Sequence, residues 1–550
     1  MKKKIKFILF FTFFLIAIIN VDLISQIPQQ SFRIFPSTVT QSEPIVTVSR
    51  SSPNLFFGSA VTFNTATAFR SEGVYVSTNF GVSWFGSDTC NGPLIVNHGG
   101  DPGVAITQNN RLVLTHMGLV FLGQYSHYSD DSGKTWSSAY TITNHQVEDK
   151  GSTFMDDEPN SPFRGRIYTS YVSFQSSPYR VWFSFSSNNA TSWSTPISIN
   201  TNPLARSSGP AIAVNKNGKL FVTWAGMTST PPIREDFISL ATSTNGGANW
   251  FVSENIFDVN GVTGTLLSKG NIRINGLPRI AIDNSNSQFS GRIYIVTNEI
   301  NNLPAGSDHD IILRYSDNDG ITWSNGIRVN QDALNNGKIQ YLPAITVDQN
   351  GGVNIIFYDD RNTSSDSAEV FLARSTDGGN TWREFPISDH RFKPKSVIGG
   401  PSNYQGDFIT LISSMNRLYA YWMDDFSGIY QIWSKIIDLN SLSIDETQFN
   451  TPNNFELYQN YPNPFSASGE STLGVKPGTT ISWQSPINGW YTIKLYNSIG
   501  EEIDTIVDGY YEAGKHSTFY TLHSTLPSGV YFYQLRAGDF IDTKKMVIIR

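Results

Sequence analysis

One eight-residue pattern occurs six times along this chain of 550 residues. It reads Ser-x-Asp/Asn-x-Gly-x-Thr/Ser-Trp, and its copies occupy residues 77–84, 129–136, 186–193, 243–250, 316–323 and 375–382. The closing tryptophans lie 52, 57, 57, 73 and 59 residues apart. A repeat of this length that is rich in strand-forming residues is typical of a β-propeller and not of a helical solenoid. The sequence therefore predicts an all-β fold built from one repeated sheet unit.

Each position of the pattern has a physical role in a tight turn. The Asp or Asn side chain is expected to accept hydrogen bonds from backbone N–H groups two residues further on, and the Gly to supply a positive φ. The Trp ring is expected to pack beside the hairpin. Ala190 stands at the Gly position of one copy, and Asn249 at the Thr position of another. A structural role without catalysis is therefore predicted for Asn79, Trp84, Asp131, Trp136, Asn188, Trp193, Asn245, Trp250, Asn318, Trp323, Asp377 and Trp382.

The repeated pattern resembles the Asp-box, or BNR repeat, of the sialidase superfamily. The resemblance covers residues 30–439 and implies a β-propeller over that range. Asp-boxes also occur in many proteins that are not sialidases, so the resemblance implies the fold more firmly than it implies an activity.

The strand pattern around each copy indicates a four-stranded unit. Strand-like runs at 344–348, 352–358 and 369–374 precede the last copy, which turns the chain into a fourth strand. A seventh unit with three such runs, at 408–437, lacks the pattern. Its fourth strand is expected from residues 31–39, because pairing the two ends of the propeller removes an exposed sheet edge. The sequence thus favours seven blades, with six as the alternative.

Charge and targeting signals limit the partners and the compartment. The net charge of −7 argues against nucleic acid and anionic membranes as partners. Cys90 is the single cysteine, so no intrachain disulfide is expected. Residues 1–25 combine a lysine-rich start with an apolar run too short for a spanning helix, as in a signal peptide. We expect an exported mature protein without a transmembrane segment.

The last part of the chain reads as a separate domain. Residues 440–454 are polar and predict a linker, and residues 455–550 lack the repeated pattern. Their alternating strands and turn signals predict a small antiparallel, Ig-like β-sandwich. The clearest strands are expected at 479–484, 491–496, 530–536 and 543–549.

This domain carries a second resemblance. FELYQNYPNPF at 455–465, LPSGVYFYQL at 526–535 and TKKMVIIR at 543–550 are similar to the C-terminal sorting domain of the type IX secretion system (Por-type). The resemblance implies the type IX machinery as a partner. It also implies a secreted protein, or one on the outer-membrane cell surface of a Bacteroidetes-like Gram-negative bacterium.

Topology predicts which end of a propeller binds ligands. In a blade of four antiparallel strands, the 1–2 and 3–4 turns lie at one end, so the Asp-boxes occupy that end. The 2–3 loops and the crossings between blades lie at the other end, where loops from several blades converge. The alternative is that polar residues there cap strands and pair locally. The residues expected at this end are Asp101, Asp149, Lys150, Arg206, Arg273, Glu299, Asp359, Asp360, Asp407, Asp424 and Asp425, with Glu43, Arg361 and Tyr404.

A sialidase would need three arginines, a Tyr–Glu nucleophile pair and an Asp as acid/base. The tyrosine nucleophile departs from the two carboxylates that most glycosidases use. Residues 31–36 (SFRIFP) approximate the motif of the first arginine, so Arg33 fits this role. No aspartate lies between Arg33 and Asp88, where the acid/base is expected. Tyr404 or Tyr358 could be the nucleophile. The candidate catalytic residues are Arg33, Glu43, Arg361 and Tyr404.

The balance of charge among the residues expected at the ligand-binding end predicts an acidic face. It holds nine carboxylates against four cations, and such a face suits a cation, a neutral polyol or a basic peptide. No cofactor or metal is expected. Short acidic clusters at 156–158 and 308–310 could hold a structural calcium ion, or be solvated loop charge.

The leading hypothesis is a secreted or cell-surface propeller that binds an extracellular glycan or protein ligand. A sialidase-like exo-glycosidase is the first alternative, so the sequence leaves open whether the protein is an enzyme. A structural surface component is the second alternative.

Overall fold

The computed structural model describes residues 30–443 apart from 68, 91–97, 174, 176 and 303–305. It also describes residues 455–549 apart from 461, 467–477, 488, 512–513, 522–525 and 539. The predicted signal peptide, and the predicted linker beyond residue 443, lie outside these residues. The chain divides into two compact units, Met1–Asp438 and Leu439–Arg550. The structure is 52% strand and 2% helix, which confirms the all-β prediction.

Antiparallel four-stranded sheets follow one another along the first unit. The first consists of β2 (Thr40–Val48), β3 (Phe56–Asn64), β4 (Phe69–Ser77) and β5 (Phe85–Ser87). The next two are joined through the long strand β9 (Tyr140–Met155), which pairs with β8 by its first half and with β10 by its second. Their other elements are β6 (Gly100–Ile106), β7 (Leu112–Met117), η1 (Leu119–Phe121), β8 (Leu122–Ser129), β10 (Ile167–Ser173), β11 (Arg180–Ser186) and β12 (Ile197–Ser198).

Three further sheets keep the same sequential strand order. They consist of β13 (Arg206–Val214), β14 (Leu220–Met227), β15 (Glu235–Ser243) and β16 (Phe251–Asp258), then β19 (Arg279–Ile282), β20 (Ile293–Glu299), β21 (Asp310–Ser316) and β22 (Ile327–Arg328), then β23 (Gln340–Val347), β24 (Val353–Asp359), β25 (Glu369–Ser375) and β26 (Arg383–Pro386). Between β16 and β19, a separate two-stranded sheet is formed by β17 (Gly264–Leu266) and β18 (Ile272–Ile274), which η2 (Leu267–Lys269) connects.

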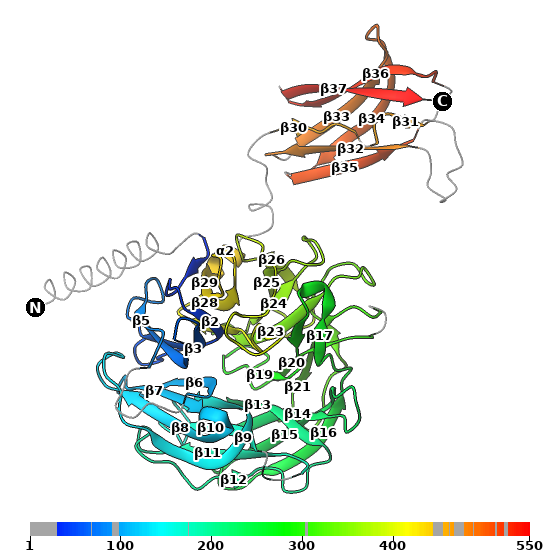
Figure 1. Cartoon of the computed structure of the whole chain (residues 1–550). Coiled ribbons are helices and arrows are strands. Elements are labelled where there is room, and N and C mark those ends of the chain that lie inside the picture. The colour runs from blue at the N-terminus through cyan, green and yellow to red at the C-terminus, as the bar shows by residue number, and fades with distance from the viewer. Residues whose placement is uncertain are drawn as a thin grey trace, which may run out of the picture. The chain divides into compact units, whose positions relative to one another are not determined.

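The last sheet joins the two ends of the unit. Strands β27 (Thr410–Ser414), β28 (Arg417–Asp424) and β29 (Gln431–Asp438) are completed by β1 (Phe32–Arg33), with Phe32 opposite Ser434. The prediction that residues 31–39 supply this strand is confirmed. The first strands then contact one another in a closed cycle, from β2 through β6, β9, β13, β19, β23 and β27 back to β2. Figure 1 shows β2, β6, β13, β19 and β23 towards the middle of this unit and β5, β12, β16 and β26 at its periphery.

The six repeated turns share one hydrogen-bond scheme. In the first copy the Ser77 hydroxyl donates to Asn79 Oδ1 (2.9 Å) and accepts from the N–H of Gly81 (3.0 Å). Asn79 Oδ1 also accepts from the N–H of Ser83 at 3.0 Å, four residues further on. The predicted acceptance two residues further on was therefore wrong, because the left-handed Gly81 (φ +75°) folds the chain back only after that point. Ala190 takes the same conformation, with φ +65°.

The tryptophans of the repeats link neighbouring sheets. Trp136 packs against Phe57 of the preceding sheet, with ring centroids 5.6 Å apart. Trp250 packs against Phe183, again in the preceding sheet, at 4.9 Å. Buried apolar side chains of both neighbours surround these rings, so each tryptophan stabilises the seam between two sheets.

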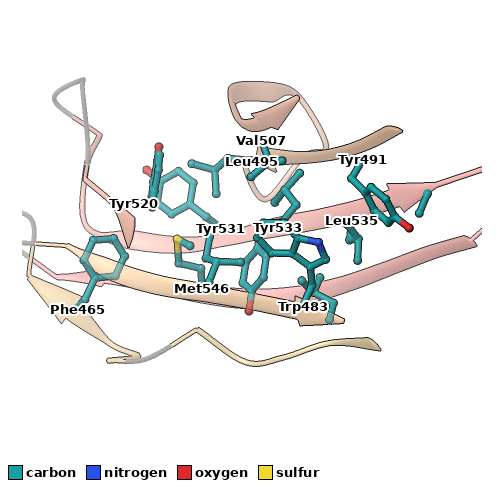
Figure 2. Packing of buried hydrophobic residues seen from close by; sticks show 14 of the residues in the cluster. Phe465, Trp483, Tyr491, Leu495, Val507, Tyr520, Tyr531, Tyr533, Leu535 and Met546 are labelled. Atoms are coloured by element: carbon teal, nitrogen blue, oxygen red, sulfur yellow. The ribbon is translucent and has the colours of Figure 1, made fainter. Parts of the chain in front are cut away.

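The second unit consists of two sheets around one core. One sheet contains β30 (Glu456–Leu457), β32 (Thr479–Ser485) and β35 (Gly514–Tyr520), and the other contains β31 (Phe465–Ser466), β37 (Phe540–Ile549), β36 (Gly529–Ala537), β33 (Gly489–Tyr496) and β34 (Glu502–Tyr511). Figure 2 shows the core residues, among them Trp483, Tyr533 and Met546, which are almost fully buried. Strand β31 runs parallel to β37, so the expectation of a purely antiparallel domain was wrong. A short helix, α2 (Leu439–Ser443), precedes these strands. No helix among the described residues has the length and apolarity needed to cross a membrane.

Candidate functional site

A cavity of about 590 Å³ opens at the end of the first unit opposite the Asp-boxes. It is bounded by the starts of β6 and β13, the ends of β3, β7 and β14, and the loops that follow them. Five of the predicted face residues meet there, although they come from distant parts of the sequence. They are Asp101, Arg206, Arg273, Tyr404 and Asp407.

Three arginines of the cavity each stack on an aromatic ring. The guanidinium carbon of Arg70 lies 5.2 Å from the centroid of Phe63, that of Arg206 lies 5.1 Å from Tyr179, and that of Arg273 lies 4.7 Å from Tyr404. A guanidinium group that is stacked on a ring keeps its fork of N–H donors in a fixed plane. The cavity therefore presents oriented donors, two of them beside the lining rings of Phe63 and Tyr404.

Arg273 is the centre of a polar cluster on one wall. Its guanidinium donates to Asp407 Oδ2, and the backbone N–H of Asp407 donates to Glu43 Oε1 at 2.8 Å. The side-chain amide of Asn275 donates to the carbonyl oxygen of Asp407 at 3.2 Å. Burial opposes the charge of Arg273, but Asp407 outweighs the burial, so the pKa of Arg273 is raised. The guanidinium stays charged at any physiological pH.

Tyr404 lies beneath this cluster and is 5% exposed. Burial raises the pKa of its phenol well above the ordinary value, and the carboxylates of Glu43, Asp407 and Asp101 add to the effect. Arg273 acts in the opposite direction. The phenol is therefore a neutral hydrogen-bonding group unless a base removes its proton.

The first strands carry a bulge where they enter the site. Glu43 and Asp101 both have a positive φ (54° and 51°), and the strand register shifts at each of them. A proline follows each residue, Pro44 and Pro102, and cannot donate a hydrogen bond to the ladder. The same proline recurs at positions 210, 278 and 343. This recurrent proline is a sequence signal for the inner end of the site, and the predictions from the sequence did not use it.

Several predicted face residues lie elsewhere. Glu299, Asp359, Asp360 and Asp424 are fully buried and bound by neighbouring donors. Their main partners are Arg314, Arg361, Lys269 and His390, in that order. For these four the alternative of local pairing is correct.

Arg33, Arg361 and Asp425 are not among the described residues that line the cavity. Arg361 is held by Asp359 and Glu384, and Asp425 pairs with Lys395. The sequence motif around Arg33 predicts a catalytic role. In the structure Arg33 lies opposite Trp433 on the outermost strand of its sheet. Asp149 and Lys150 lie within β9, and their side chains fall outside the described part of the structure.

The predicted acidic character was wrong for this cavity. Its lining has the guanidinium groups of Arg70, Arg206 and Arg273 against the carboxylates of Asp101 and Asp407. The remaining carboxylates of the predicted face are mostly neutralised inside the sheets by cations that sequence order did not reveal. Donors for an acidic or hydroxyl-rich ligand therefore outnumber the acceptors.

The acidic loop clusters also use their oxygens internally. Asp156 Oδ2 accepts from the Ser161 hydroxyl at 2.6 Å, and Glu158 pairs with Arg50 at 2.9 Å. Asp310 pairs with Arg328 at 2.6 Å. Among the described residues, no group of three or more His, Cys, Asp or Glu side chains is arranged to hold a metal ion.

Two parts of the site were not predicted from the sequence. Arg70 is the second residue of β4, where no motif marks it. Thr265 and Asn275 belong to the β17–β18 hairpin. The hairpin had a detectable signal, since the spacing of 73 residues between Trp250 and Trp323 is the widest of the five.

Ring-closed four-stranded sheets, Asp-box turns and a cavity at the opposite end together define a β-propeller of the Asp-box class. The BNR repeat-like domain matches residues 179–462, slightly more than half of the chain. The protein belongs to this BNR repeat-like family. The resemblance of the repeats is thereby confirmed at the level of the family. No curated protein matches the chain.

Several solved structures resemble this chain at low identity. An ulvan lyase has a TM-score of 0.47 at 10% identity, over 74% of this chain and 96% of the lyase. A protein of unknown function from Dyadobacter fermentans has a TM-score of 0.42 at 11% identity, over 74% and 98% of the two chains. An α-L-arabinofuranosidase from Fusarium graminearum has a TM-score of 0.38 at 14% identity, over 62% and 93%. Likenesses of this size carry no conclusion about activity.

Proposed function

We propose that this protein is an exported, seven-bladed BNR-repeat propeller that binds an extracellular glycan in the arginine-lined cavity. The observation that carries the proposal is the set of three arginine–aromatic pairs that converge there from different sheets. Sugar rings offer apolar faces for aromatic contact and hydroxyl or acidic oxygens for guanidinium donors. The closed cycle of seven first strands supports the blade number. No cofactor is part of the proposed function.

Isothermal titration calorimetry of the full chain tests the binding site. The probes are hexasaccharides of galacturonic acid, chondroitin sulfate, laminarin and cellulose, so that two arms are acidic and two are neutral. We expect at least one probe to bind, and Arg206→Gln to weaken its binding about tenfold, since a hydrogen bond to a charged group contributes about 1.5–3 kcal/mol. Arg383→Gln is the matched control, because Arg383 stacks on Phe385 outside the cavity. Equal losses in both variants would refute the site.

A hydrolase is a second candidate, favoured by the surroundings of Tyr404. Glu43, Asp407 and Asp101 all act electrostatically on its phenol, and a carboxylate beside a tyrosine would suit a Tyr–Glu nucleophile. Turnover of fluorogenic glycosides that is lost in Tyr404→Phe would establish an enzyme. A folded protein without turnover on the whole panel would leave binding as the function.

The proposed export route rests on the C-terminal sequence motifs. The described strands of the second unit include most of the motifs at 526–535 and 543–550. In a bacterium with a type IX system, removal of residues 526–550 is expected to leave the protein in the periplasm. Unchanged surface or medium localisation would contradict the proposal.

A further inference from the structure

The β17–β18 hairpin is an addition to the blade pattern. Strand β16 completes one four-stranded sheet and β19 begins the next, and the hairpin pairs with neither. It nevertheless forms a large part of the cavity, since six of the 21 described lining residues lie between positions 263 and 275. The extra length of this repeat therefore builds one wall of the site.

A single buried carboxylate fastens both feet of the hairpin. Glu235, at the start of β15, is 2% exposed. Its Oε2 accepts from the N–H groups of Val262 and Thr263, both at 3.1 Å. Its Oε1 accepts from the N–H of Gly276 at 2.7 Å and from the Thr263 hydroxyl at 2.5 Å. Hydrogen bonds of this kind to an ionised carboxylate are about twice as strong as neutral ones.

The far part of the hairpin is anchored to other sheets. The ammonium group of Lys269 is completely buried and donates to Asp360 Oδ2 and the Ser365 carbonyl oxygen, both at 2.7 Å. The backbone N–H of Arg273 donates to the carbonyl oxygen of Asn403 at 2.6 Å. The hairpin thus spans from the sheet of β15 to the loop after β24 and to the segment before β27.

These contacts determine where one of the three cavity arginines lies. Arg273 is in β18, three residues before Gly276, and among the described strands β18 pairs only with β17. Its stacking on Tyr404 and its pairing with Asp407 both require the hairpin to stay in place. Glu235 does not line the cavity, so any effect it has on a ligand must pass through the hairpin.

We propose that Glu235 is a positioning residue and that the hairpin it fastens, residues 262–276, is the specificity-determining element of the cavity. This inference rests on the proposed glycan-binding function. Displacing the hairpin removes the guanidinium of Arg273 from the site while leaving Arg70 in β4 and Arg206 in β13. Sugars that need all three guanidinium groups lose affinity, and the order of preference among the probes changes.

Amide hydrogen exchange on the full chain tests the positioning role without any ligand. In Glu235→Gln we expect residues 262–276 to exchange at least about tenfold faster, with unchanged exchange in the other sheets. Thr263→Val removes only one of the four hydrogen bonds and gives a smaller change in the same segment, so it serves if the first variant folds poorly. Glu254→Gln is the control, because Glu254 is a half-buried carboxylate of the same sheet that binds Asn200 and Ser239 instead. Unchanged exchange in both hairpin variants overturns the positioning role.

A double-mutant cycle with the four hexasaccharides tests the link to specificity. We expect Glu235→Gln and Arg273→Gln each to weaken the best-binding probe about tenfold, and the double variant to be no weaker than either. Additive losses would show that Glu235 acts as general structure and overturn the specificity claim. If the wild-type chain binds none of the probes, the proposed function fails, while the exchange experiment still decides the positioning role.

Discussion

The two ends of the propeller use polar side chains in opposite ways. At the Asp-box end the main hydrogen bonds join residues two to four positions apart, as between Ser83 and Asn79. At the cavity end the partners are far apart in the chain, as between Asp407 and Glu43 or Arg273 and Asp407. The first scheme is a local device that can be copied with each repeat. The second scheme occurs once and depends on the arrangement of several sheets. Its residues can therefore be substituted without disturbing the Asp-box turns.

The largest predicted effect is a loss of stability at the Asp-box end. Gly247 has φ +90°, and a Cβ added there would lie 2.2 Å from Cε1 of Phe183. We expect Gly247→Ala to lower the free energy of unfolding by about 2–5 kcal/mol, from backbone strain plus overpacking. Chemical denaturation measures it. Gly291→Ala is the control, since φ is +91° there with nothing within 4 Å, and only the smaller strain remains. Equal losses would mean that packing at the turn is unimportant.

The next effect depends on pH and also concerns this end. Burial raises the pKa of Asp157 from 3.8 to about 6, although Arg50 acts against the rise. A carboxyl group with a raised pKa in the folded state contributes stability below pH 3.8, and this contribution is lost as the pH rises through 6. Asp157→Asn should therefore stabilise the protein by roughly 1–2 kcal/mol at pH 8, after allowance for solvent screening, and by little at pH 4. Thermal melts at the two pH values check the sign.

A smaller loss is expected from one Asp-box side chain. Asn79→Ala removes the acceptor of two hydrogen bonds in the first turn and should cost about 1 kcal/mol. Asn79→Asp keeps the acceptor and should be nearly neutral, because Asp131 and Asp377 occupy the same position in other copies. Urea unfolding of the two variants compares them. A similar loss in both would show that the turn needs the amide itself.

The smallest effect on stability is expected at the cavity end. Arg70 stacks on Phe63 and donates to the carbonyl oxygen of Gly99 at 3.3 Å, but it belongs to no repeated network. Arg70→Gln should change the free energy of unfolding by no more than about 0.5 kcal/mol. Its effect should appear instead in the titrations with acidic hexasaccharides. A large loss of stability would erase the contrast between the two ends.

The sequence was most informative where structure is local. The turns, the strand order and the closure by residues 31–39 follow from short patterns and from the need to pair a sheet edge. The end of the propeller that bears the cavity also follows from strand order alone. The pairing of Asp360 with Lys269 and that of Glu299 with Arg314 do not follow from the sequence. The sequence does not show which cation lies next to a given carboxylate in the fold. The sequence therefore predicted that these carboxylates face a ligand, whereas the structure buries them.

The site itself was predictable in part. Topology predicted that Asp101, Arg206, Arg273, Tyr404 and Asp407 lie at one end, and the structure brings them to one cavity. Arg70 could not be found, since a lone arginine at the start of a strand belongs to no pattern. The sequence does not distinguish Glu235 from other strand residues. Its role follows only from the structure, in which both ends of the hairpin donate hydrogen bonds to it.

The pairing of β1 with β29 has a consequence for the order of folding. Phe32 leaves the ribosome early, but its partner Ser434 is made only after every other sheet of the propeller. Strand β1 must therefore remain without its partner β29 through most of synthesis. The last sheet is completed by a contact of very long sequence separation. Final closure is a late event that any translocation before folding would postpone further. A chain that is interrupted before β29 keeps two open sheet edges, each able to pair with another molecule.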